Sequence, residues 1–150
     1  RVALLQITAS DDPEANLVTL RDMLRDAAAN GAEFALTPEV SNVVSLSKTH
    51  QNAVLRLEAD DPTLAGLRKE AKALGIWLLI GSLALKTKDA DGRFANRSFL
   101  IGPDGEIVAR YDKIHMFDVQ VTPEETFRES DGYRPGHQAV VADTPFGKIG

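Results

Sequence analysis

The sequence predicts an α/β protein in which a mixed β-sheet carries helices on one face. Three observations predict this class. In the first half of the chain, short apolar runs typical of strands alternate with longer segments in which leucine and alanine recur at helical spacing. Beyond Ser82 this alternation gives way to Asp-Gly pairs, which are typical of hairpin turns. The 150 residues, 43% hydrophobic and 26% charged, are enough to bury a core.

The first strand and helix follow from local signals. Residues 2–7 form an apolar run that hardly alternates, so we expect a strand that is buried on both faces. Asp12 can cap the helix that follows, Pro13 suits its first position, and the pair Asn30-Gly31 can end it. The apolar positions of this helix recur at helical spacing and are Leu17, Leu20, Leu24 and Ala28.

A second strand, at residues 34–36, delivers Pro38-Glu39 at its carboxyl end. The pair Asp61-Pro62 then begins another helix, which Gly75 ends. Its apolar face is made of Leu64, Leu67, Ala71 and Leu74. Residues 76–82, which include Trp77, are expected to form a third buried strand.

The second half of the chain predicts hairpins. The turns Asp91-Gly92 and Asp104-Gly105 flank residues 94–101 and 106–111, which we expect to be antiparallel neighbours.

We expect residues 117–135 to form a long loop with one helical turn, because they are charged and interrupted by prolines. Strands are expected to resume at residues 138–142 and from Lys148 onward. Because the helices cover only one face of an apolar sheet, a second sheet or a partner subunit is expected to cover the other face.

Composition excludes several classes of function. A net charge of −5 gives no electrostatic reason to expect nucleic acid or an anionic membrane as partner. The apolar run at residues 2–7 is too short for a signal peptide or a membrane span. Cysteine is absent, which excludes a disulfide framework and agrees with the reducing cytoplasm.

No cofactor or metal is expected from the motifs. The turn after the first strand contains no glycine, so neither a dinucleotide fingerprint nor a phosphate loop is available. The three histidines, His50, His115 and His137, are scattered and lack zinc-ligand spacing. We expect surface or turn roles for His50 and His137, and a structural role for His115 in hydrogen-bonding the loop after Lys113.

Two charged residues stand at the ends of apolar strands. Glu39 follows the second strand and Lys113 follows the last hairpin strand, and a carboxylate and an ammonium are the parts of an acid–base and oxyanion site. Each has an ordinary alternative. Glu39 could be a helix-start carboxylate, and Lys113 could be an exposed lysine at a strand end.

A set of motifs in order along the chain decides between these alternatives. They are Leu36-Thr37-Pro38-Glu39, Gly81-Ser82, Asn96-Arg97-Ser98, residues 111–118, Phe127-Arg128-Glu129-Ser130 and Gly147-Lys148-Ile149-Gly150. Together they resemble the nitrilase, or carbon–nitrogen hydrolase, superfamily, in the branch of omega-amidase and deaminated glutathione amidase. The resemblance implies a four-layer α-β-β-α sandwich. Residues 1–150 would be the N-terminal part of a single domain that continues beyond residue 150, and copies would pair as a homodimer or a higher homo-oligomer.

The resemblance also implies roles for individual residues. Glu39 matches the general base of the family, Lys113 its catalytic lysine and Glu129 its second glutamate, although a glutamate in a charged loop would ordinarily be solvated. The family's cysteine nucleophile has no position among these residues and is expected just after Gly150. The implied activity is that of an amidase of EC class 3.5, which hydrolyses a small linear amide through a thioester. If the cysteine is absent, the protein would instead be a non-catalytic member that binds a ligand or partner.

The chemistry requires a base and a cation. Glu39 would take the thiol proton, and we expect burial to raise its pKa towards neutrality while Lys113 opposes that rise. Lys113 would stabilise the oxyanion, and Glu129 would hold Lys113, unless Glu124 or Glu125 in the same loop does so. Arg128 and Arg134 are candidates to bind a carboxylate of the substrate, and both could also be solvated.

Overall fold

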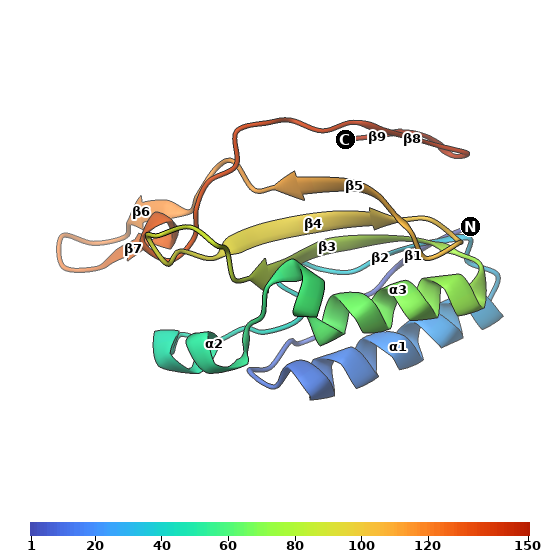
Figure 1. Cartoon of the computed structure of the whole chain (residues 1–150), viewed down its shortest axis with the longest axis horizontal. Helices are drawn as coiled ribbons and strands as arrows, with labels where there is room; N and C mark the ends of the chain where they lie inside the picture. The colour runs from blue at the N-terminus through green and yellow to red at the C-terminus, as the bar shows by residue number, and fades with distance from the viewer.

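The computed structural model describes residues 1–150 and contains a five-stranded sheet with helices packed on one face (Figure 1). The sheet follows the chain order, with β1, β2 and β3 parallel and β3, β4 and β5 antiparallel. Its strands are β1 (Val2–Leu4), β2 (Phe34–Leu36), β3 (Trp77–Leu85), β4 (Ala95–Ile101) and β5 (Ile107–Asp112). The predicted mixed sheet and both hairpin strands are therefore confirmed.

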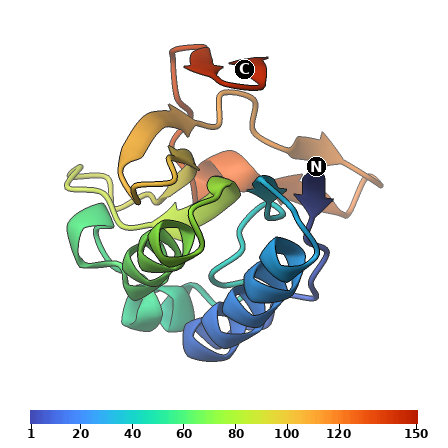
Figure 2. The same ribbon diagram turned by 90° about the vertical axis from the view of Figure 1, so that its right-hand side faces the viewer.

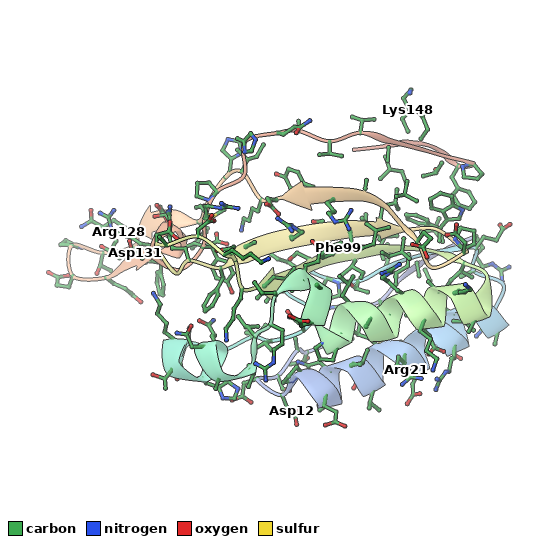
Figure 3. All side chains as sticks on the ribbon, in the orientation of Figure 1. Asp12, Arg21, Phe99, Arg128, Asp131 and Lys148 are labelled. Carbon is green, nitrogen blue, oxygen red and sulfur yellow. The ribbon has the colours of Figure 1, made fainter.

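Two long helices lie side by side under the sheet, as Figure 2 shows in end view. Helix α1 (Pro13–Ala29) begins where Asp12 accepts hydrogen bonds from the Glu14 and Ala15 amides, and α3 (Pro62–Leu74) ends at Gly75, whose φ is 65°. Their apolar faces and the facing strands share one core of buried residues, which includes Leu20, Leu24, Leu64, Leu67, Leu78, Ile80 and Phe99. Phe99 is labelled in Figure 3. The predicted helices and their caps are confirmed.

Two further helical segments were not predicted from the sequence. Helix α2 (Lys48–Val54) begins at Ser47, whose hydroxyl accepts from the His50 amide, and a 3₁₀ turn follows at Glu58–Asp60. Neither segment has a buried residue, so neither shows the apolar periodicity on which the prediction of helices depends.

The first strand differs from its prediction. We expected residues 2–7 to be buried on both faces, but β1 is an edge strand in which Val2 is 58% and Leu4 77% exposed. The helices cover the opposite face of this strand, where Ala3 packs against the core. The expectation is wrong because in this chain nothing covers the second face of the sheet at its β1 edge.

Residues 117–135 form more regular structure than the loop that we expected. Strands β6 (Asp118–Gln120) and β7 (Thr126–Arg128) pair as a hairpin, which projects beyond the left end of the sheet in Figure 1. The single helical turn that we expected is present as the 3₁₀ turn Glu129–Asp131. This turn is tied to the hairpin because the Asp118 carboxylate accepts from the Ser130 amide at 3.0 Å and from its hydroxyl at 2.6 Å.

The last part of the chain crosses the second face of the sheet. The strand expected at residues 138–142 is wrong, because residues 138–141 pair with nothing, and the closing hairpin is β8 (Ala142–Thr144) with β9 (Gly147–Ile149). The ring of Phe146 meets the ring of Phe34 edge to face at 5.7 Å. Elsewhere a cavity of about 600 Å³ lies between this last segment and strands β3, β4 and β5, and its lining is mainly apolar.

Candidate active site

The loop after β2 is held against β3 by a set of short hydrogen bonds. The Thr37 amide donates to the Leu79 carbonyl at 3.0 Å, and the Thr37 hydroxyl accepts from the Gly81 amide at 3.1 Å. A Cβ atom at Gly81 would lie 2.3 Å from the Thr37 carbonyl oxygen, so no larger residue fits there without moving the loop. This contact explains a glycine inside an otherwise apolar strand.

Glu39 is fixed at a sharp bend in the same loop. The next residue, Val40, has a φ of 48°, which is rare for a β-branched residue. Its amide donates to the Ser82 hydroxyl at 2.8 Å, and the Ser41 amide donates to the Ser82 carbonyl at 2.9 Å. The bend turns the Glu39 side chain towards the ends of β4 and β5.

Lys113 and Glu129 approach from two other segments. Lys113 follows β5 directly, and its amide donates to the Asn96 carbonyl on β4 at 2.9 Å. Glu129 begins the 3₁₀ turn after β7, and its Oε2 accepts from the Phe117 amide at 2.6 Å. Three segments far apart in the sequence therefore meet at the left-hand end of the sheet in Figure 1.

The three side chains form one ionic network. Lys113 Nζ donates to Glu39 Oε1 at 2.9 Å and to Glu129 Oε2 and Oε1 at 2.9 and 3.1 Å. The Glu129 side chain is 16% exposed, that of Lys113 26% and that of Glu39 58%. Glu39 is therefore the carboxylate of this network that solvent or a ligand can reach.

The network changes the acidity of its members. The Lys113 ammonium lowers the pKa of Glu39 below its usual value, although burial acts in the other direction. We expected burial to raise the pKa of Glu39, and this expectation is wrong. The side chain is only partly buried, so the hydrogen bonds from Lys113 and Asn96 outweigh the effect of burial. Burial would lower the pKa of Lys113, but its hydrogen bonds to Glu39 and Glu129 raise it, so the ammonium stays charged.

A cavity of about 370 Å³ opens at the network, and it is lined by Glu39, Lys113, Phe117, Phe127, Arg128 and Glu129. Arg128, labelled in Figure 3, makes no salt bridge, although Asp118 lies opposite it in the register of the β6–β7 hairpin. Arg134 pairs with Asp89 and lines a different cleft, with Arg97 and Arg110. Of the two candidate arginines, only Arg128 is brought to the glutamates and the lysine.

Other residues that sequence analysis considered lie elsewhere. Glu124 and Glu125 are exposed and do not line the cavity. His115 is exposed and makes no hydrogen bond, so our expectation that it ties down the loop is wrong. His50 Nε2 lies 2.8 Å from the Asp11 carbonyl, and His137 is exposed. No group of three or more His, Cys, Asp or Glu side chains is arranged to hold a metal ion.

Two residues at the site were given no role by the sequence analysis, although Asn96 stands in one of its motifs. The Asn96 side chain donates to Glu39 Oε1 at 2.8 Å. The ring of Tyr133 packs edge to face on Phe94 at 5.9 Å, and burial followed by the nearby glutamates raises the pKa of Tyr133 to about 12. An asparagine inside an apolar strand was the available signal for Asn96, because a buried amide needs partners. For Tyr133 the sequence holds no such signal.

The motif around Lys113 also contains a structural ion pair. Arg97 on β4 contacts Asp112 on β5 through two hydrogen bonds of 2.6 and 2.8 Å, and it reaches Glu58 at 2.7 Å. Arg97 and Asp112 are cross-strand partners in the register of the sheet. Asp112 therefore fixes the strand that carries Lys113 and does not enter the cavity.

Comparison with known proteins identifies the family. The family model described as carbon–nitrogen hydrolase matches residues 1–150. The chain belongs to the carbon–nitrogen hydrolase family. The predicted nitrilase-type resemblance is thereby confirmed, and so is its branch, by the relatives described next.

No helix of the chain has the length and apolar composition needed to cross a membrane.

Two curated relatives show the similarity. The chain is 32% identical to deaminated glutathione amidase of Yersinia enterocolitica, over 99% of this chain and 52% of the relative. It is also 32% identical to omega-amidase NIT2 of Homo sapiens, over 100% of this chain and 52% of the relative. The chain thus spans about half the length of the curated relatives that it matches.

Solved structures confirm the nitrilase-type fold. The NitFhit protein of C. elegans superimposes with a TM-score of 0.88 at 27% identity, covering 99% of this chain and 36% of that one. An amidase of Nesterenkonia sp. AN1 superimposes with a TM-score of 0.74 at 27% identity, covering 96% of this chain and 53% of that one. That amidase structure holds acrylamide added at its active site cysteine.

Proposed function

We propose that the protein hydrolyses the carbon–nitrogen bond of a small linear amide, with Glu39 as general base and Lys113 as the oxyanion cation. The observation that carries the proposal is the ionic network, in which three segments bring two carboxylates within 2.9 Å of one ammonium at the wall of a cavity. Ion clusters also occur elsewhere in the chain, as at Arg97, Asp112 and Glu58, but the network at Lys113 has an exposed carboxylate beside its ammonium at a cavity. Membership of the carbon–nitrogen hydrolase family supports the same reaction.

The reaction needs a nucleophile that residues 1–150 do not contain, since none is a cysteine. We propose a cysteine just after Gly150, and the active-site cysteine named for the Nesterenkonia amidase supports this kind of nucleophile. The thiol would give its proton to Glu39 while sulfur bonds to the amide carbon and the carbonyl electrons move to oxygen. The carbon–nitrogen bond would then break as Glu39 returns the proton to nitrogen, leaving a thioester. Glu39 would next take a proton from water while the water oxygen bonds to the thioester carbon. The proton would then return to sulfur as the carbon–sulfur bond breaks, which releases the carboxylic acid and restores the thiol.

Lys113 fits the oxyanion role because its charge is fixed before the reaction begins. Its ammonium lies on the wall of the cavity, and the two glutamates keep it protonated. A preorganised cation of this kind typically stabilises the developing oxyanion by about 3–4 kcal/mol. Glu129 is the less exposed of the two glutamates and would hold Lys113 rather than exchange protons.

The substrate we propose is an amide that carries a carboxylate away from the scissile bond. Arg128 supports this choice, since it lines the cavity without making a salt bridge and a guanidinium binds carboxylates in bidentate geometry. The names of two relatives, omega-amidase and deaminated glutathione amidase, suggest a 2-oxo acid omega-amide such as 2-oxoglutaramate, or deaminated glutathione.

A substrate panel tests this function. The complete polypeptide would be given 2-oxoglutaramate, deaminated glutathione, an N-carbamoyl amino acid and an aliphatic nitrile, with products followed by mass spectrometry. We expect turnover of one of the two amides, and stoichiometric alkylation of the cysteine to abolish it. Turnover of the nitrile or the carbamoyl compound alone would contradict the amide assignment. Absence of any cysteine near the site, with ligand binding retained, would favour the non-catalytic binding protein.

We also propose that the protein acts in the cytoplasm as a homodimer or a higher homo-oligomer. The exposed apolar side chains of Val2 and Leu4 on β1 leave a sheet edge that a second copy could cover. Sedimentation of the complete polypeptide would test the assembly, and a single monomeric species at micromolar concentration would contradict it.

A further inference from the structure

Asn96 touches every member of the ionic network. It lies on β4, is 3% exposed, and donates from Nδ2 to Glu39 Oε1 at 2.8 Å and, at the limit of 3.5 Å, to Glu129 Oε1. Its backbone carbonyl accepts from the Lys113 amide at 2.9 Å. A buried amide in a rigid central strand therefore fixes the relative positions of two carboxylates and an ammonium.

The two oxygens of Glu39 are not equivalent in this arrangement. Oε1 accepts from both Lys113 Nζ and Asn96 Nδ2, whereas no hydrogen bond reaches Oε2. An oxygen that already accepts two donors is a poorer proton acceptor than one that accepts none. The side chain is 58% exposed and lines the cavity, so its free oxygen has space for a reacting group.

Asn96 adds a hydrogen bond to this site without adding a charge. Glu39 and Glu129 share a single ammonium, so the network carries one uncompensated negative charge. A neutral donor stabilises the carboxylates and keeps this negative charge, whereas a second cation would cancel it and an aspartate would add to the repulsion. The side-chain amide is thus suited to this position in a way that an isosteric carboxylate is not.

We propose that Asn96 is a positioning residue which, together with Lys113, occupies Oε1 of Glu39 and leaves Oε2 as the oxygen that takes and returns the proton. This inference rests on the proposed hydrolysis, since it assigns a direction to the proton transfer within that reaction. Asn96 itself exchanges no proton and acts through Glu39.

Four other groups bear on the ionisation of Glu39. Lys113 contacts it directly, Glu129 shares the same ammonium, Arg128 lines the same cavity, and Tyr133 lies close enough for the glutamates to influence its hydroxyl. None of these residues is changed when Asn96 is replaced, so a change in the titration of Glu39 reports on the amide.

The test compares Asn96→Ala with Asn96→Asp in the complete polypeptide. Both variants remove the donor to Oε1, so the acidic limb of the kcat/KM profile should move upward by about one pH unit in Asn96→Ala. It should move by about two in Asn96→Asp, which adds a like charge. We expect kcat to fall about 10-fold to 100-fold and KM to change less than about threefold.

The order of the two variants separates positioning from a merely structural role. A structural role predicts that the isosteric Asn96→Asp is the milder change, and that result, or an unmoved acidic limb in both variants, would overturn the inference. Asn96→Asp keeps the test available if Asn96→Ala does not fold. Glu70→Gln is the control for the loss of a buried polar contact, because Glu70 is 5% exposed and its carboxylate bonds Arg21 and Arg25 of α1 instead of any residue of the network.

A second measurement does not depend on turnover. The side-chain carboxyl of Glu39, labelled with ¹³C and assigned by its absence in Glu39→Gln, would be titrated in each variant. Upward movement of its midpoint from wild type to Asn96→Ala to Asn96→Asp supports the inference even if no amide is hydrolysed, in which case the proposed function alone fails. Identical midpoints in an active enzyme would refute the role of Asn96 and leave the proposed function standing.

Discussion

Lys113 is the cation within hydrogen-bonding distance of both glutamates, so Lys113→Ala and Lys113→Arg separate its charge from its shape. Its Nζ makes three contacts of 2.9, 2.9 and 3.1 Å, and its side chain is 26% exposed. Removing the ammonium should lower kcat by about 10²–10³, which corresponds to about 2.7–4 kcal/mol of lost oxyanion stabilisation.

The cost to folding should be smaller than the cost to catalysis. Glu39 is more than half exposed, so water screens its share of the ion pair, whereas Glu129 at 16% exposure loses a partner that water replaces poorly. We expect Lys113→Ala to destabilise the fold by about 1–3 kcal/mol, the usual range when a buried acceptor loses its donor. Melting curves and kcat, measured on the same preparations, give both quantities.

Lys113→Arg is the sharper variant. A guanidinium is planar and larger than an ammonium, and Nζ already lies 2.9 Å from both carboxylates, so the extra atoms have no room. We expect less than about tenfold recovery over Lys113→Ala. Lys69→Arg is the control, because Lys69 is exposed on α3 and does not line the cavity. Near-normal turnover in Lys113→Arg would refute the assignment of Lys113 to the site.

Three further predictions follow from the same geometry. Glu39→Gln keeps shape but cannot carry a proton, so turnover should fall at least about 10³-fold, while the melting temperature at pH 7 falls only slightly because Glu39 is 58% exposed. The pKa of Glu39 is lowered from 4.5, so ionised Glu39 contributes stability above that value and loses it as pH falls through the lower pKa. The melting temperature should therefore fall less between pH 7 and acid pH in Glu39→Gln than in the wild type. Gly81→Ala would place Cβ 2.3 Å from the Thr37 carbonyl oxygen and should reduce both stability and turnover, which differential scanning calorimetry and kinetics would show. Arg128→Ala should raise KM for an anionic amide about 10-fold or more and leave KM for an uncharged amide unchanged, and equal effects on both would contradict the carboxylate role.

The elements that the sequence predicted correctly are those whose signals are local. Asp12 and Asp61 cap helices, Gly75 ends one, and Asp91-Gly92 and Asp104-Gly105 lie in turns, because each depends on backbone conformation within a few residues. The burial of β1 was predicted wrongly because it depends on what covers the second face of the sheet. The β6–β7 hairpin was missed because strands of three residues carry too few apolar positions to alternate.

The candidate site was partly predictable for a related reason. The apolar runs placed Glu39 and Lys113 at strand ends, and the resemblance to a family assigned each of them an expected role. The lowered pKa of Glu39 could not be anticipated, because it depends on the balance between partial burial and two donors to one oxygen. The sequence also could not show that Arg128 lies at the site and Arg134 does not. Arg134 pairs with Asp89 in the turn before β4, and no sequence signal links these two residues.

The two glutamates of the network illustrate what only the structure can distinguish. Both are carboxylates bound to the same ammonium, and the sequence offers no reason to assign one of them the proton. Both oxygens of Glu129 are occupied, Oε1 by Lys113 and Asn96 and Oε2 by Lys113 and the Phe117 amide. Glu39 has one oxygen free and is more than three times as exposed, at 58% against 16%. A carboxylate whose acceptors are all used cannot accept a proton without breaking a hydrogen bond, and this supports our proposal that Glu39 is the base and Glu129 the scaffold.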